Sequence, residues 1–231
     1  MACFPQNHKA HLSASEQLHK QMFQQRMQEI PVEELLNEKM SERQKHELYH
    51  YEVFPIVPWG PETTMKQKTP LRINYHDRYL LVCSHAHSWL EMLCVVSGTC
   101  AHRVGRFYGQ LKTGDVLVIS PGTTHSFLPL GDDCIIYNLY FKIEEFEADF
   151  PDVLHGTGVL STFLLKTLYA DSENSYLIFH TGNYFSGDNA LAALVEHWFH
   201  PRQHLGERLR SYSQLFFLDL LDVQAQPPTV S

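Results

Sequence analysis

The sequence lacks any long hydrophobic run and any pattern of an export signal. No apolar segment approaches the roughly 20 residues that a membrane-spanning helix needs. The N-terminal residues are polar and lack the apolar core of a signal peptide. We therefore expect a cytoplasmic protein with no membrane association.

The cysteines also lack a functional pattern, because no two of them form a CxxC pair of the kind that redox and zinc motifs use. Four of the five lie in apolar segments typical of β-strands. We interpret them as small buried residues in a reducing compartment rather than as a disulfide framework. They are Cys3, Cys83, Cys94, Cys100 and Cys134.

Basic residues are too few for a nucleic-acid-binding chain. The sequence has 18 Lys and Arg residues against 26 Asp and Glu residues, which gives a formal net charge of −8. Proteins that hold nucleic acid need a basic face. We also find no helix-turn-helix pattern with a basic recognition helix in the sequence. This chain by itself is therefore not expected to bind DNA.

Residues 1–70 are predicted to form a helical and extended N-terminal segment. Helical periodicity covers residues 13–50, with a capping box at Ser13 and Glu16. A second helix is predicted over residues 32–48, which are rich in strong helix formers. Prolines then favour extended chain laid over a surface. They are Pro55, Pro58, Pro61 and Pro70.

Residues 71–155 are predicted to form a β-domain. Short β-branched and aromatic segments over residues 71–143 alternate with turns that contain glycine or proline. Strands at this spacing indicate an antiparallel sandwich or barrel.

Residues 156–226 are predicted to be mainly helical, and residues 227–231 to begin a linker. The segment 176–179 is either a strand or a buried connection. The predicted helix at about 206–224 carries more apolar residues than one packed face requires, among them Leu215, Phe216 and Leu220. This surplus indicates burial on several sides or a partner helix. We expect a homodimer through residues 206–224.

The stretch HAHSWLEMLCVVSG, residues 85–98, aims polar side chains in one direction. On an extended chain His85, His87, Trp89 and Glu91 share one face, because side chains two residues apart point the same way. Two imidazoles and a carboxylate on an apolar strand indicate metal ligands, parts of a ligand pocket, or the remnant of either.

These residues carry a resemblance to a known superfamily. His85-x-His87, three residues, Glu91, six residues and Gly98 resemble the first cupin motif, and the stretch from Gly114 to His125 resembles the second. Two positions of the second motif depart from the usual pattern, with Ser120 in place of a proline and Pro129 in place of an asparagine. The resemblance implies a small antiparallel jelly-roll barrel in which the three histidines and the glutamate converge.

The wider phrasing HxHxxxE…VVSG…HRVG…GDVLVISPGTTHSF, followed by two apolar helices and a linker, is similar to the N-terminal domain of AraC-type transcription regulators. The resemblance implies a mainly β fold with α elements: a cupin-like antiparallel jelly-roll barrel flanked by an N-terminal helical segment and C-terminal dimerisation helices. It also implies a small-molecule effector, plausibly a carbohydrate, and DNA binding only through a C-terminal domain that is not in this chain. A regulator of this kind is not an enzyme. The alternative is a metal-dependent cupin enzyme, an oxygenase or a sugar isomerase.

The candidate ligand-binding residues are His85, His87, Trp89, Glu91 and His125. All of these except Trp89 form a 3-His/1-Glu set for a divalent metal, and zinc, nickel, manganese and iron all suit the ligand types. The set can equally line an effector pocket, and Trp89 can stack on a sugar ring or belong to the core.

Two further pairs of neighbours leave a choice open. Only one of Tyr137 and Asn138 can face the interior of the barrel, since adjacent strand residues point to opposite faces. The same holds for His102 and Arg103, and Arg103 is a candidate for binding an anionic effector.

Overall fold

The computed structural model describes residues 11–39, 69–169, 175–223 and 225–226. The strands are β1 (Leu71–Tyr75), β2 (Val82–His85), β3 (Leu90–Val104), β4 (Phe107–Lys112), β5 (Asp115–Ile119), β6 (His125–Phe141), β7 (Tyr176–His180) and β8 (Ala225–Gln226). The helices are α1 (Ala14–Arg26), α2 (Val32–Leu35), α5 (Ile143–Asp149), α6 (Pro151–Leu154), α7 (Val159–Tyr169), the 3-10 turn η2 (Tyr184–Ser186), α8 (Ala190–Phe199) and α9 (Leu205–Leu221).

The strands form one antiparallel sheet in the order β1-β6-β3-β5-β7-β8, with β2 also pairing with β6 and β4 with β3. The two long strands, β3 and β6, roll the sheet, because each pairs with different neighbours along its two halves. The predicted mainly β fold with flanking helices is confirmed, and the rolled antiparallel sheet is consistent with a jelly roll. The segment 176–179 belongs to a strand of the same sheet. The domain boundary near residue 155 stays a prediction.

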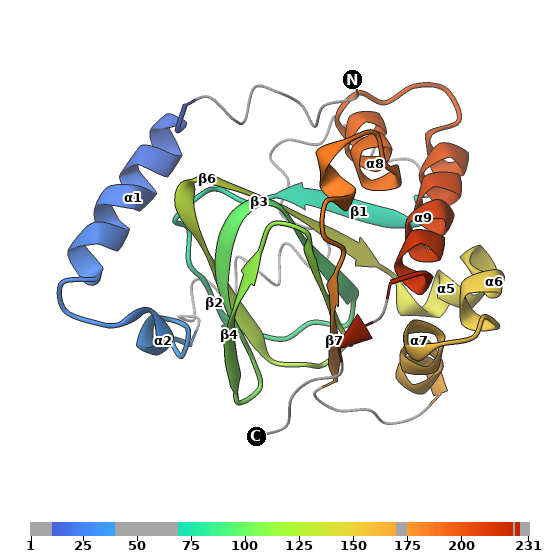
Figure 1. Cartoon of the computed structure of the whole chain (residues 1–231), viewed down its shortest axis with the longest axis horizontal. Coiled ribbons are helices and arrows are strands. Elements are labelled where there is room, and N and C mark those ends of the chain that lie inside the picture. The colour runs from blue at the N-terminus through green and yellow to red at the C-terminus, as the bar shows by residue number, and fades with distance from the viewer. Residues whose placement is uncertain (1–10, 40–68, 170–174, 224, 227–231) are drawn as a thin grey trace.

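Alternation along the strands divides the core between the two faces of the sheet. Leu90, Met92 and Cys94 of β3 pack with the C-terminal helices, whereas Leu93 and Val95 pack inside the roll. This division follows from the period of two along a strand. Figure 1 shows the N-terminal helices on one side of the rolled sheet and the C-terminal helices on the other.

A glycine allows the sheet to roll at the centre of β3. The pairing of β3 with β6 is irregular between Val95 and Thr99. Gly98 lies there with a φ of 75°, and a Cβ on it would lie 2.6 Å from the Cα of Cys134. Only glycine adopts this conformation at such a close approach without strain.

The N-terminal segment begins as predicted and then departs from the prediction. The capping box of Ser13 and Glu16 is present at the start of α1. The second helix ends at Leu35, so the predicted helix is wrong for residues 36–39, and its remainder lies outside the described residues. The helix stops early because Leu35 and Leu36 pack against Ala101 and Leu128 of the barrel, while the chain runs on to a bridge with Ser84.

The C-terminal helices explain most of the apolar surplus within a single chain. In α9, Phe216, Phe217 and Leu220 are buried in the core beneath the sheet. Leu215 and Leu218 are 50% and 42% exposed. Burial on several sides, one of the two expected alternatives, therefore accounts for most of the helix. None of the described helices is long and apolar enough to cross a membrane.

The described cysteines match the sequence-based interpretation, since all are buried and none forms a disulfide. They are Cys83, Cys94, Cys100 and Cys134. Cys3 and the prolines at positions 55, 58 and 61 lie outside the described residues.

Candidate functional site

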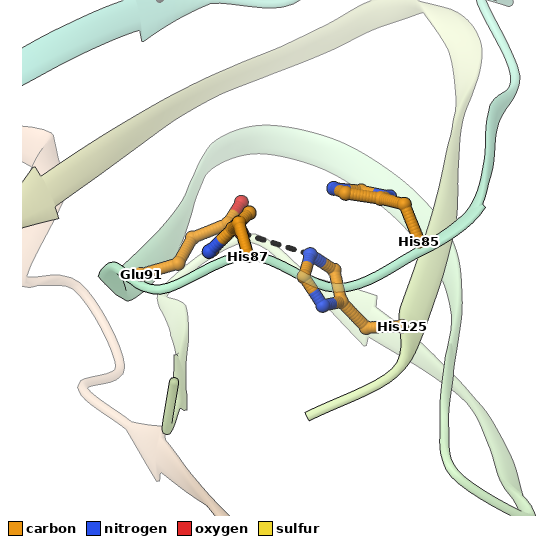
Figure 2. Close-up of side chains that lie close together, drawn as sticks. All are labelled: His85, His87, Glu91 and His125. Atoms are coloured by element: carbon orange, nitrogen blue, oxygen red, sulfur yellow. Dashed lines mark hydrogen bonds and ion pairs between the residues drawn. The ribbon is translucent and has the colours of Figure 1, made fainter. Parts of the chain in front are cut away.

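Pairing between β2 and β6 brings the predicted site residues together. His85 ends β2 and lies directly opposite His125, the first residue of β6. Glu91 is the second residue of β3, and His87 lies on the connection that precedes it. Figure 2 shows the four side chains converging on one space. The structure therefore assembles all four of the predicted metal-ligating residues.

The distances within this His–Glu cluster are short. The Nε2 atoms of His87 and His125 lie 2.8 and 2.9 Å from Oε2 of Glu91. One donor atom from each of the four residues lies within 4.8 Å of the other three. Zinc bonds of about 2.0–2.2 Å place tetrahedral ligands about 3–4 Å apart, so a small closure of the side chains would complete a site.

Backbone carbonyls orient two of the imidazole rings. Nδ1 of His85 lies 2.9 Å from the carbonyl oxygen of Cys83, and Nδ1 of His125 lies 2.9 Å from that of Thr123. A carbonyl only accepts, so each Nδ1 carries the proton when the ring is neutral, and each Nε2 presents its lone pair to the cluster. Nε2 of His125 is buried and makes no aligned hydrogen bond, despite its short distance to Glu91. A nitrogen aimed at a shared point beside a carboxylate suits a metal ligand.

Electrostatic interactions within the cluster shift the pKa values of three of its residues. Burial, together with the neighbouring His125, lowers the pKa of His85 to about 3. Burial alone would raise the pKa of Glu91, but His125 and His87 outweigh it and hold that pKa well below its usual value. Burial would lower the pKa of His125, yet the Glu91 carboxylate raises it. A neutral His85 and an ionised Glu91 are ready donors, whereas His125 would release a proton on binding a cation.

A second row of polar residues supports Glu91. The side-chain amide of Asn138 donates to Oε1 of Glu91 and lies 3.0 Å from the hydroxyl of Tyr140. Tyr137 points the other way into the helix-covered core. Asn138 therefore faces the interior of the barrel, which settles the choice that the sequence left open. Tyr140 was not recognised from the sequence, although its parity with Asn138 was a signal for it.

Trp89, like His87, lies on the connection that precedes β3. Its ring lies beside Arg72, whose guanidinium carbon is 5.8 Å from the ring centroid. His102 is buried, and Arg103 donates from Nε to the carbonyl oxygen of Gly105. The candidate anion-binding arginine of the sequence is thus engaged locally.

A family model matches most of the rolled sheet. The model of the AraC-like ligand binding domain matches residues 73–162. Residues 73–162 are thus similar to this ligand binding domain. The matched segment of this domain contains all four residues of the His–Glu cluster, as well as Asn138 and Tyr140. No curated protein sequence matches the chain significantly.

Among solved structures, an apo ToxT variant from Vibrio cholerae has a TM-score of 0.47 and 14% identity, covering 65% of this chain and 55% of its own. The chain thus spans about half the length of that protein. The Mn(II)-containing oxalate decarboxylase of Bacillus subtilis has a TM-score of 0.25 and 16% identity, over 27% of this chain and 18% of its own. KdgF from Halomonas has a TM-score of 0.31 and 21% identity, over 34% of this chain and 75% of its own. Similarities this distant carry no functional argument.

Proposed function

We propose that this chain is the effector-sensing part of an AraC-type transcription regulator. The match of residues 73–162 to the AraC-like ligand binding domain carries this proposal. Effector binding in the barrel would change how α9 and the following linker present a DNA-binding domain that lies outside this chain. The regulator would act in the cytoplasm and without a catalytic step.

Buried polar atoms without hydrogen-bond partners inside the barrel support the proposal that a small molecule binds there. Oδ1 of Asn74 and Oδ1 of Asn138 are buried and have no hydrogen-bond partner within the described part of the chain. The two residues lie directly opposite each other on β1 and β6. Leaving such groups unpaired costs about 1–3 kcal/mol each. A small polar molecule that donates to both oxygens, such as a carbohydrate, would recover this free energy.

Thermal shift measurements with neutral sugars and other metabolites test the sensing function. A ligand at 100 times its dissociation constant adds about 2.7 kcal/mol to the free energy of unfolding. We expect at least one polar metabolite to raise the melting temperature, and Asn138→Leu to abolish that shift. A chain that no small metabolite stabilises would contradict the proposal.

We further propose that the His–Glu cluster binds one divalent metal, with His85, His87, Glu91 and His125 as ligands. When bound, the metal would supply a Lewis-acidic centre for an oxygen of the effector. Elemental analysis of untagged protein, purified without chelator, should find about one zinc, nickel, manganese or iron ion per chain. His87→Ala should lose the metal, whereas His155→Ala, at an exposed histidine, should keep it. Metal-free protein that also refuses added metals would defeat this proposal.

We propose a homodimer through residues 206–224, with a smaller apolar interface than the sequence indicated. Leu215 and Leu218 are the exposed apolar residues of α9, whereas Leu220 is buried within the chain and is unsuitable as a test of an interface. The double variant Leu215→Glu and Leu218→Glu should convert a dimer to a folded monomer in mass measurements at micromolar concentration. A wild-type monomer would refute the dimer.

The completeness of the ligand set favours one second candidate, a metal-dependent cupin enzyme. Oxygenases and sugar isomerases both need a metal with an open position. Turnover of a stabilising ligand by the metal-loaded protein, absent from His87→Ala, would support an enzyme. Recovery of the unchanged ligand would support a sensor.

A further inference from the structure

Arg72 occupies an unusual place beside the His–Glu cluster. It lies on β1 directly opposite Tyr140 of β6, and Tyr140 lies directly opposite Glu91 of β3. Directly opposed residues of antiparallel strands share one face, so Arg72, Tyr140 and Glu91 form a row inside the roll. Two strand spacings, about 10 Å, separate the backbones at the ends of this row.

The charge of Arg72 is not neutralised by a carboxylate in the part of the chain that the structure describes. By contrast, Arg78 pairs with Glu16, and Arg210 pairs with Asp149. Arg72 instead lies over the ring of Trp89. The residue is half-buried, and burial lowers its pKa without an opposing contribution from an acid.

A half-buried guanidinium held by an aromatic ring is prepared for an anion. Its planar donors match the two oxygens of a carboxylate, and charge-assisted pairs of this geometry are the stronger hydrogen bonds. The Trp89 ring orients the guanidinium at little further entropic cost, because a cation–π contact already restricts it. A neutral sugar would leave this charge without a partner.

We propose that Arg72 and Trp89 form a carboxylate-binding subsite, so that the effector is a small hydroxylated organic acid. Its carboxylate pairs with Arg72, and its hydroxyl groups face Tyr140 and the unpaired amide oxygens of Asn74 and Asn138. This inference rests on the proposed sensing function and narrows its ligand from polar metabolites in general to acids. An acidic sugar belongs to this class.

Matched pairs of probes test the inference on the full chain. Thermal shifts are measured with galacturonate and galactose, gluconate and glucitol, and lactate and propylene glycol, at equal concentration and ionic strength. We expect at least one acid to raise the melting temperature more than its neutral partner. For that acid, Arg72→Gln should raise the dissociation constant in calorimetry by about tenfold or more, the effect of losing one charged hydrogen-bonding partner.

Arg103→Gln is the matched control, since Arg103 is also a half-buried arginine of the barrel but bonds to the backbone of Gly105. It should keep the affinity of the wild type. If Arg72→Gln does not fold, Arg72→Lys replaces it, and the loss of the planar fork should weaken binding several-fold. Unchanged affinity in the folded Arg72 variant overturns the subsite. Equal shifts by acids and neutral partners overturn the subsite but leave the sensing function standing, whereas no shift by any probe overturns both.

Discussion

The ion pair between Glu16 and Arg78 attaches the N-terminal helix to the barrel, and Glu16→Gln is the sharpest test of that attachment. Both residues are 2% exposed. Nε and Nη2 of Arg78 donate to the two carboxylate oxygens at 2.8 and 2.9 Å. The Tyr75 hydroxyl and the Ser13 amide donate to the same carboxylate at 2.9 and 2.8 Å. The substitution keeps the shape of the side chain and removes its charge.

The pKa of Glu16 gives the size of the expected change in the free energy of unfolding. Burial alone would raise this pKa, but the hydrogen bonds from Arg78, Ser13 and Tyr75 lower it from 4.5 to about 2. A shift of this size corresponds to about 3 kcal/mol of folding free energy at neutral pH. Breaking a buried ion pair from one side costs about 3–5 kcal/mol. We therefore expect Glu16→Gln to lower the free energy of unfolding by about 3 kcal/mol at pH 7.

The pH dependence of the stability difference separates the loss of the charge of Glu16 from any change in packing. Because the folded state holds the carboxylate ionised, its contribution is complete above the unfolded pKa of about 4.5 and is lost as the pH falls towards about 2. The difference between wild type and Glu16→Gln should shrink by about 1 kcal/mol between pH 5.5 and pH 3.5. Urea denaturation followed by circular dichroism measures both quantities. Glu29→Gln, an exposed glutamate of the same segment, should change neither. A Glu16→Gln effect that is below about 1 kcal/mol at pH 7, or independent of pH, would refute this reasoning.

Two further predictions concern the barrel. Gly98→Ala should destabilise it by more than about 2 kcal/mol, since the new Cβ would meet the backbone of Cys134 at 2.6 Å. Gly122→Ala, at a similar φ but with nothing within 4 Å, should cost only about 1 kcal/mol, and equal costs in denaturation would disprove the steric argument. Burial lowers the pKa of His102 to about 4 in the folded chain. As the pH falls below about 6.5, His102 therefore gains a proton in the unfolded chain before it does so in the folded chain. Wild type should thus lose about 2 kcal/mol more than His102→Leu between pH 7 and pH 5, and parallel losses would show that His102 does not titrate as expected.

Interactions between residues close in sequence determined the start of the first helix, the strands and part of the candidate site. The capping box joins Ser13 and Glu16, which are three positions apart, so the start of α1 could be predicted from the sequence. The alternation of apolar residues identified the strands, because the period of two follows from the backbone itself. The spacing of His85, His87 and Glu91, with the resemblance to cupins, predicted that these three residues and His125 lie together, and the structure brings them together.

The tertiary structure decided what depends on contacts distant in sequence. Strand alternation required Tyr137 and Asn138 to point to opposite faces of the sheet. Only the packing of the helices decided which of the two faces the cluster. Trp89 lies on the connection before β3, outside the strands whose alternation the sequence displays, so its contact with Arg72 could not be predicted from spacing. Arg72 gained its place beside Trp89 through the pairing of β1 with β6, whose partners lie more than sixty residues apart. Propensity and spacing act over a few residues, whereas such juxtapositions arise from the register of distant strands.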